Sequence, residues 1–133
     1  MSTFIRIAEV WVPSADGAVL QLADGIYDAA PSFGSESRSL TFRPGEGLPG
    51  RAWQEGRPVL IAQLEGSFFC RTAAAQAAGL GSAVAVPVFR DQTLTCVVVM
   101  LCGNDETDIG AVELWRNDPR ISTDLKLADG YFG

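Results

Sequence analysis

The chain of 133 residues has no histidine and only three cysteines, and these two shortages exclude several kinds of site. Without histidine, and without a Cys-x-x-Cys pair, the sequence offers almost no ligands for zinc. An odd number of cysteines also argues against the disulfide framework that is typical of small secreted domains. We therefore predict no metal site and no disulfide framework.

Positive charge is scarce as well, and long hydrophobic runs are missing. Ten Lys and Arg stand against sixteen Asp and Glu, and the basic residues are scattered singly, which gives no track for a phosphate backbone. The longest apolar run, Cys96 to Cys102, is too short to span a bilayer, and the first residues lack the features of a secretory signal. We expect a cytoplasmic domain with no nucleic-acid partner and no membrane association.

The stretch from Phe42 to Leu60 has the clearest local pattern of the chain. Two glycines suit left-handed backbone, and the proline that follows them suits the first turn of a helix. A later glycine and proline end that helix. The pattern predicts a helix over residues 48–55 and a strand over residues 59–62. The residues that carry it are Gly45, Gly47, Pro49, Gly56 and Pro58.

The next segments predict one more helix and a pair of strands. Ser67 is a candidate N-cap for a helix over residues 68–78, which would end at Gly79. Two β-rich runs follow, at residues 82–89 and 93–102, and the connection between them is short enough for a hairpin.

These segments together resemble a known family. "FRPGEGLPGRAWQEGRPVLI", then a helix ending in "AAGLGSAVAVPV", then a hairpin into "CVVVML" closely resemble a GAF domain over Ile5 to Gly103. The resemblance implies a GAF-like (PAS/profilin-like) α+β fold, with a central antiparallel sheet of about five to six strands and short helices on the pocket side. A typical member also begins and ends with long covering helices, and this sequence shows neither.

The chain also repeats one of its own motifs. Glu-Val-Trp at residues 9–11 returns as Glu-Leu-Trp at residues 113–115, and "LADGIY" at residues 22–27 returns as "LADGYF" at residues 127–132. The offset is 104 residues at the first element and 105 at the second. We interpret the match as one β-hairpin encoded twice, as in a tandem array.

This interpretation divides the chain into two parts. Residues 1–110 form the GAF domain, and residues 111–133 form a terminal hairpin that resembles residues 8–28. An uncovered sheet face or edge is a liability, so we expect the terminal hairpin to extend or cover the sheet. It would do so within the chain or by exchange across a homodimer.

The resemblance places a ligand pocket beneath the loop and helix that span about Leu64 to Gly79. The candidate residues carry aromatic rings, one thiol, one guanidinium and one hydroxyl: Trp53, Phe68, Phe69, Cys70, Arg71 and Ser82, with Tyr27 and Phe33 from the first half. Such a set would suit a small planar or anionic ligand. Two alternatives stay open: Trp53 and Phe68 also fit a hydrophobic core, and Arg71 also fits a solvated helix face.

Cys70 is the residue with a chemical role to consider. If Ser67 is the N-cap, Cys70 falls at the third helical position, where the helix dipole and Arg71 would favour the thiolate. The GAF-fold free methionine-(R)-sulfoxide reductase carries a catalytic cysteine at a comparable place. However, this chain lacks that enzyme's other redox cysteines near the glycine-rich turn, and residues 72–86 contain no Asp or Glu. We predict an inert, half-buried Cys70 and no catalysis.

Residues that the sequence lacks disfavour the other ligands known in the family. Bilin-binding and haem-binding members usually use a histidine, and the signature of cyclic-nucleotide-binding members is missing here. The ligand or cofactor therefore stays unknown. We predict a non-catalytic, small-molecule-binding sensory or regulatory module that acts through protein contacts as a homodimer. The alternatives are a ligand-free dimerisation module and a thiol-dependent reductase.

Overall fold

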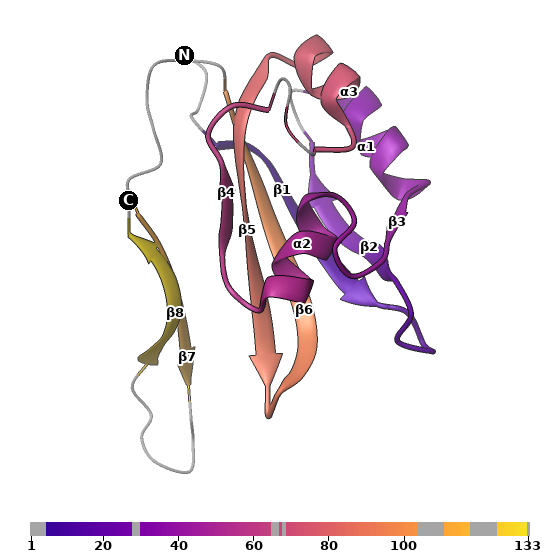
Figure 1. Cartoon of the computed structure of the whole chain (residues 1–133). Helices are drawn as coiled ribbons and strands as arrows, with labels where there is room; N and C mark the ends of the chain where they lie inside the picture. Colours follow the sequence, from indigo (N-terminus) through magenta and orange to yellow (C-terminus); the bar gives the residue numbers. More distant parts are fainter. Residues whose placement is uncertain are drawn as a thin grey trace.

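The computed structural model describes residues 5–27, 30–64, 67, 69–103, 111–117 and 125–132. Within these residues the chain forms one six-stranded antiparallel sheet, in the order β3-β2-β1-β6-β5-β4, and a separate pair β7-β8 (Figure 1). The strands are β1 (Ile5–Pro13), β2 (Leu20–Ile26), β3 (Thr41–Phe42), β4 (Val59–Ile61), β5 (Leu80–Arg90), β6 (Thr93–Gly103), β7 (Ala111–Asn117) and β8 (Leu125–Phe132). The helices are α1 (Pro31–Arg38), α2 (Gly47–Glu55) and α3 (Thr72–Ala77). The predicted α+β, GAF-like fold is confirmed.

The hydrophobic core lies between the sheet and the three helices. In β1, Ile7, Glu9 and Trp11 are fully buried, while the residues between them are partly exposed. Glu9 pairs with Val99 and Trp11 with Val97 of β6, and cross-strand partners share a face. The buried side of β1 is therefore the helix side, which includes a carboxylate.

The loop-helix-strand unit predicted from glycine and proline is confirmed as α2 and β4. Gly56 has φ 69° and ends α2 in the left-handed region, as the sequence pattern predicts. Gly50 is required for another reason, since a Cβ there would overlap the backbone carbonyl oxygen of Arg43. The loop before α2 can close only because this position has no side chain.

The hairpin predicted near residue 90 is also confirmed. β5 and β6 pair along their length and are joined at Asp91 and Gln92, whose φ angles are 51° and 70°. Positive φ at both central residues is typical of the tight turns whose twist matches that of the flanking strands. These two long strands form the centre of the sheet together with β1.

The helix predicted over residues 68–78 is wrong at its N-terminal end. The helix α3 covers only Thr72–Ala77, and Ser67 is not its N-cap. Instead, the Ser67 hydroxyl donates to the carbonyl of Leu64 at 2.6 Å and accepts from the N–H of Phe69 at 3.1 Å. Such local bonds compete with helix formation, so the chain turns here before the helix starts.

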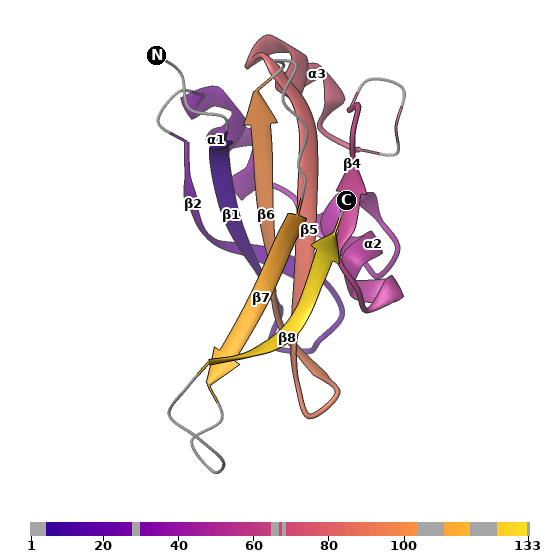
Figure 2. The same cartoon turned by 90° about the vertical axis from the view of Figure 1, so that its left-hand side faces the viewer.

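The pair β7-β8 lies on the side of the main sheet opposite the helices (Figure 1). Figure 2 faces that side and shows β7 and β8 in front of β6 and β5. Val84 and Val86 of β5 face the same side and are only 1% and 4% exposed. The proposed division into residues 1–110 and 111–133, and the choice between cover and exchange, stay predictions. In the described part of the chain, no helix is long and apolar enough to cross a membrane.

Candidate functional site

A buried ion pair between Arg71 and Glu9 forms the centre of the candidate site. Nη1 of Arg71 donates to both carboxylate oxygens of Glu9, at 3.0 and 2.8 Å, and to the hydroxyl of Ser37 at 2.7 Å. The side chains of Arg71 and Glu9 are 1% and 0% exposed. The pair joins residues that are 62 positions apart in the sequence.

Two further donors complete the surroundings of the Glu9 carboxylate. Nε1 of Trp11 donates to Oε1 at 3.0 Å, and the hydroxyl of Tyr27 donates to Oε2 at 2.6 Å. Burial first, and then the hydrogen bond and negative charge of Glu9, raise the pKa of Tyr27 well above its ordinary range. The hydroxyl therefore keeps its proton and remains a donor to the carboxylate.

Strands β1 and β2, helix α1 and the connection before α3 each position one or two side chains of this cluster. The alternation of β1 points Glu9 and Trp11 toward the helices, and Tyr27 follows the end of β2. In α1, the Ser37 hydroxyl donates to the carbonyl of Phe33 at 2.8 Å, which leaves its oxygen free to accept from Arg71. Arg71 itself is held in the connection between β4 and α3, directly before the helix begins.

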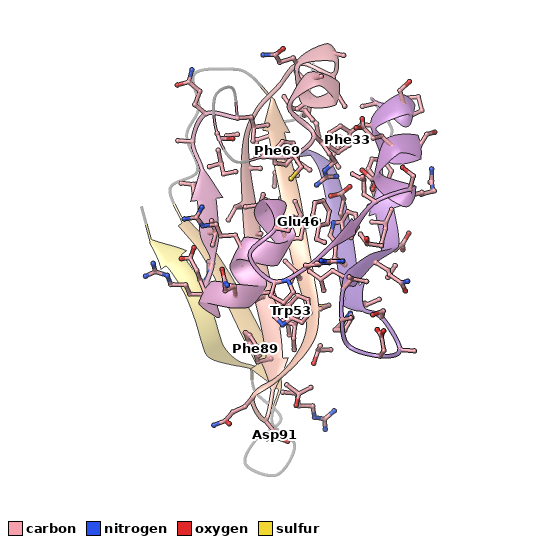
Figure 3. The ribbon with its side chains drawn as sticks, turned by 45° about the vertical axis from the view of Figure 1, so that its right-hand side comes forward. Phe33, Glu46, Trp53, Phe69, Phe89 and Asp91 are labelled. Carbon is pink, nitrogen blue, oxygen red and sulfur yellow. The ribbon has the colours of Figure 1, made fainter. Side chains whose placement is uncertain are left out.

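Aromatic rings surround the guanidinium. Its Cζ lies 4.7 Å from the ring centroid of Phe33, 5.0 Å from Phe69, 5.5 Å from Trp11 and 5.7 Å from Phe42. Phe33 and Phe69 lie toward the same end of the helix side in Figure 3. Arginine suits this environment because its delocalised charge is weakly hydrated and attracted by ring faces.

Part of the guanidinium is buried without hydrogen bonds. Among the described residues, Nε and Nη2 of Arg71 have no hydrogen-bond partner. Buried unpaired donors are costly, and native structures contain few of them. Nε and Nη2 also form the edge of the group that binds a carboxylate or another oxoanion through two parallel hydrogen bonds. Among the described residues, this edge of Arg71 is therefore unpaired.

The structure brings together only some of the predicted site residues. Phe69, Arg71, Tyr27 and Phe33 are buried around the ion pair. The alternative in which Arg71 lies on a solvated helix face is therefore wrong. The carboxylate of Glu9, which is distant in the sequence, holds Arg71 in the interior.

Trp53 and Ser82 do not belong to this cluster. Trp53 packs half-buried against the core and lies toward the other end of the helix side, near Phe89, in Figure 3. Ser82 pairs with Cys102 on the face of β5 that points away from the helices. Phe68 lies outside the described residues.

The structure corrects the interpretation of Cys70 as a helix-activated thiol. Cys70 is exposed and precedes α3, so it does not occupy the third position of a helix. Partial burial of the thiol and then the negative charge of Glu46 raise its pKa, against the smaller opposing effect of Arg71. Both effects disfavour the thiolate at neutral pH.

Sequence reasoning missed Glu9 and Ser37 as site residues. The available signal was the position of Glu9 between Ile7 and Trp11 on the apolar face of a strand. A charged residue at such a position is expected to be paired. Glu9 also supplies a carboxylate to a region whose own segment, residues 72–86, contains none.

Comparison of the fold with solved structures gives several similar chains. The A. aeolicus NLH2 GAF domain in an inactive state shares 17% identity at a TM-score of 0.59, over 77% of this chain and 60% of that one. The free methionine-R-sulfoxide reductase of Neisseria meningitidis, in complex with its substrate, shares 17% at 0.60, over 78% and 56%. A Staphylococcus aureus NreA protein mutated in its nitrate binding site shares 14% at 0.58, over 75% and 76%.

These similarities are similarities of fold, and this chain spans less than two thirds of the length of the first two proteins. A search of curated protein sequences found no match. The family model described as GAF domain, however, matches residues 1–117, which is most of the chain. GAF domains are generally regulatory modules that bind small molecules, and this chain belongs to the GAF domain family.

Proposed function

We propose that this GAF domain is a non-catalytic regulatory module that binds a small anion at Arg71. The observation that carries the proposal is that the three guanidinium nitrogens are used unequally in hydrogen bonding. Nη1 is fully used by Glu9 and Ser37, whereas Nε and Nη2 are buried and have no partner among the described residues. A carboxylate or oxoanion on the unused edge would satisfy both nitrogens without breaking the ion pair.

The surroundings of Arg71 limit the ligand class. The guanidinium and the Glu9 carboxylate together carry no net charge, so a bound monoanion adds one buried negative charge and a dianion adds two. The second charge would be strongly disfavoured in a site of such low exposure. The rings of Phe33 and Phe69 further favour a ligand with a flat or apolar body. We therefore propose a small monoanion, and the NreA structure, described with a nitrate binding site, is a precedent within this fold.

The position of Arg71 also supplies a route for regulation. Arg71 and Phe69 both belong to the connection between β4 and α3. A ligand on Nε and Nη2 would therefore hold this connection against β1 and α1, through Glu9 and Ser37. In this proposal, ligand binding changes how firmly Arg71 and Phe69 are held, and protein contacts, including those of a homodimer, transmit the change.

A non-catalytic role fits the chemistry of Cys70, the candidate nucleophile of the sequence analysis. Cys70 is exposed and its pKa is raised, chiefly by partial burial of the thiol and then by the negative charge of Glu46. Cys96 and Cys102 belong to β6, and burial raises the pKa of the Cys96 thiol as well. The reductase alternative would require Cys70 to act as a thiolate, which its environment disfavours.

Thermal unfolding of the full chain with formate, acetate, nitrate and sulfate tests the proposal. A monoanion at 100 times its dissociation constant should stabilise the fold by about 2.7 kcal/mol, and sulfate should do so less. Arg71→Lys keeps the charge but removes the two-nitrogen edge, so it should abolish the saturable shift. Arg57→Lys, at an arginine whose side chain is 74% exposed, is the matched control and should leave it unchanged. If none of these anions gives a saturable shift and native mass spectrometry of freshly purified protein finds no retained anion, the proposal is refuted.

A second candidate function is a ligand-free dimerisation module. It is favoured by the close surroundings of Arg71, where four aromatic rings lie within 6 Å of Cζ together with Glu9 and Ser37. Native mass spectrometry separates the two functions. A dimer without retained ligand, and without any response to the anions above, supports the dimerisation module.

A further inference from the structure

The terminal hairpin β7-β8 repeats the backbone pairing of the first hairpin β1-β2. Both are antiparallel, and both have a single register shift one residue before the tryptophan. The pairs in the first hairpin are Glu9↔Gly25, Val10↔Asp24 and Trp11↔Leu22, and those in the second are Glu113↔Gly130, Leu114↔Asp129 and Trp115↔Leu127. The sequence repeat is therefore also a repeat of conformation.

The position of the register shift makes the match specific. A bulge changes the direction of one strand and is a particular feature of a given hairpin. Here it falls at the step from residue 10 to 11 and again at the step from 114 to 115. The extra residue that changes the offset from 104 to 105 lies between the two strands of the hairpin, at residues 14–19 in the first and 118–124 in the second. The paired parts of the two hairpins are equivalent position by position.

Chain connectivity allows the second hairpin to reach the place of the first. In the sheet, β1 lies antiparallel to β6, with Ile5 opposite Cys102. The position equivalent to Ile5 is residue 109, and only five residues separate it from Gly103 at the end of β6. Connections of this length commonly join antiparallel neighbours. β7 can therefore follow β6 as its direct neighbour in the same chain.

We propose that β7-β8 is an alternative occupant of the place of β1-β2 in the main sheet of the same chain. In this arrangement Glu113 becomes the partner of Arg71, and Trp115 takes the position of Trp11. The strand that pairs with β3 also keeps its apolar residue, since Leu125 is equivalent to Leu20. The exchange thus retains the ion pair on which the candidate ligand site depends. It does not rest on the proposed ligand.

Two positions make the first hairpin the favoured occupant. Ile7, which is fully buried, is replaced by Ala111, and Tyr27, which donates to Glu9, is replaced by Phe132. The first change leaves a cavity and the second removes a hydrogen bond to a carboxylate. The alternative arrangement is therefore the minor state. It differs from the major state in the residues around Arg71. It lacks the tyrosine hydroxyl, and it releases β1-β2 from the sheet.

Restoring these two contacts provides the test. Ala111→Ile with Phe132→Tyr, in the full chain, should favour the exchanged state by about 30-fold or more, from the isoleucine alone. Hydrogen-deuterium exchange should then show a loss of protection for amides of β1 and a gain for those of β7, while β6 stays protected. Adding Glu113→Gln should reverse the change. The matched control is Ala128→Ile, which alters β8 at a position equivalent to the exposed Ala23 of β2 and should leave β1 protected.

The outcome is decisive in each case. If β1 keeps its protection in the Ala111→Ile/Phe132→Tyr chain, the hairpins do not exchange and the proposal is overturned. If protection shifts but native mass spectrometry gives the mass of two chains, exchange occurs between copies, and the intramolecular form proposed here is wrong. A shift at the mass of one chain supports the proposal. Binding of the anions to Arg71 in the original chain is measured separately, so failure of one proposal leaves the other standing.

Discussion

Replacement of Arg71 by methionine should destabilise the fold strongly, because it removes the cation from a buried pair. Methionine approximates the length of the arginine stem, so the main change is the loss of charge and of the bonds from Nη1 to Glu9 and Ser37. Removal of one partner of a buried ion pair costs about 3–5 kcal/mol. The unpaired Nε and Nη2 already carry a desolvation cost that methionine would relieve, so we expect about 3 kcal/mol.

Urea unfolding measures this change. A loss of about 3 kcal/mol corresponds to a fall of about 2 M in the urea midpoint for a domain of this size. Arg51→Met is the matched control, because Arg51 forms an i,i+4 pair with Glu55 whose side chains are 46% and 29% exposed. Pairs of this kind contribute about 0–1 kcal/mol, so the control should shift the midpoint little.

A double-mutant cycle isolates the ion pair from the other effects of the substitution. Glu9→Gln keeps an acceptor for Trp11 and Tyr27, and the double variant leaves no unpaired charge in the interior. We therefore expect the double variant to be more stable than the sum of the two single losses implies. The cycle is measured in chains that carry Glu113→Gln, so that the second hairpin supplies no carboxylate. A loss for Arg71→Met no larger than that for Arg51→Met, or strictly additive losses, would refute the reasoning.

Three further predictions follow from the geometry. The pKa of Tyr27 is raised in the folded state, so above pH 10.0, its ordinary value, the unfolded chain loses this proton first. The free energy of unfolding should fall by up to about 1.4 kcal/mol per pH unit, a slope that Tyr27→Phe should reduce in denaturant titrations. The raised pKa of Cys70 predicts slower alkylation by iodoacetamide at pH 7.5 than for a model cysteine peptide, read by mass spectrometry; a faster rate would contradict it. Gly50→Ala should lower the melting temperature far more than Gly56→Ala, because a Cβ at Gly50 overlaps backbone, whereas one at Gly56 meets no atom within 4 Å and carries only conformational strain of about 1 kcal/mol.

The parts of the fold that the sequence predicts well are those with local causes. Gly56 ends α2 because its own backbone is left-handed, and the tight turn between β5 and β6 follows from the short connection between two β-rich runs. The error at α3 is also local. Ser67 can cap a helix or bond to its own neighbours, and no nearby residue decides between these choices.

The candidate site was predicted less completely because its centre is a contact between distant residues. Arg71, Phe69, Tyr27 and Phe33 were named from the family resemblance, but the partner that fixes Arg71 is 62 residues away. In the sequence, Glu9 stands out only as part of the repeat. Its role follows from burial, which alternation in β1 indicates but does not fix until the sheet and helices are in place.

The unequal use of the guanidinium nitrogens bears on the choice between a ligand site and a closed interior. If this region served packing alone, a pair of apolar side chains of similar volume would be as stable as the ion pair, or more stable, and no donor would be left unpaired. Here Glu9 accepts from Trp11, Tyr27 and Arg71, so the carboxylate is well satisfied, while the arginine is not. Arg71 is held by one nitrogen, and its two-nitrogen edge is left unpaired. This arrangement is therefore unfavourable for a closed hydrophobic core but suitable for binding a small anion. This asymmetry favours the ligand-binding function over the closed interior.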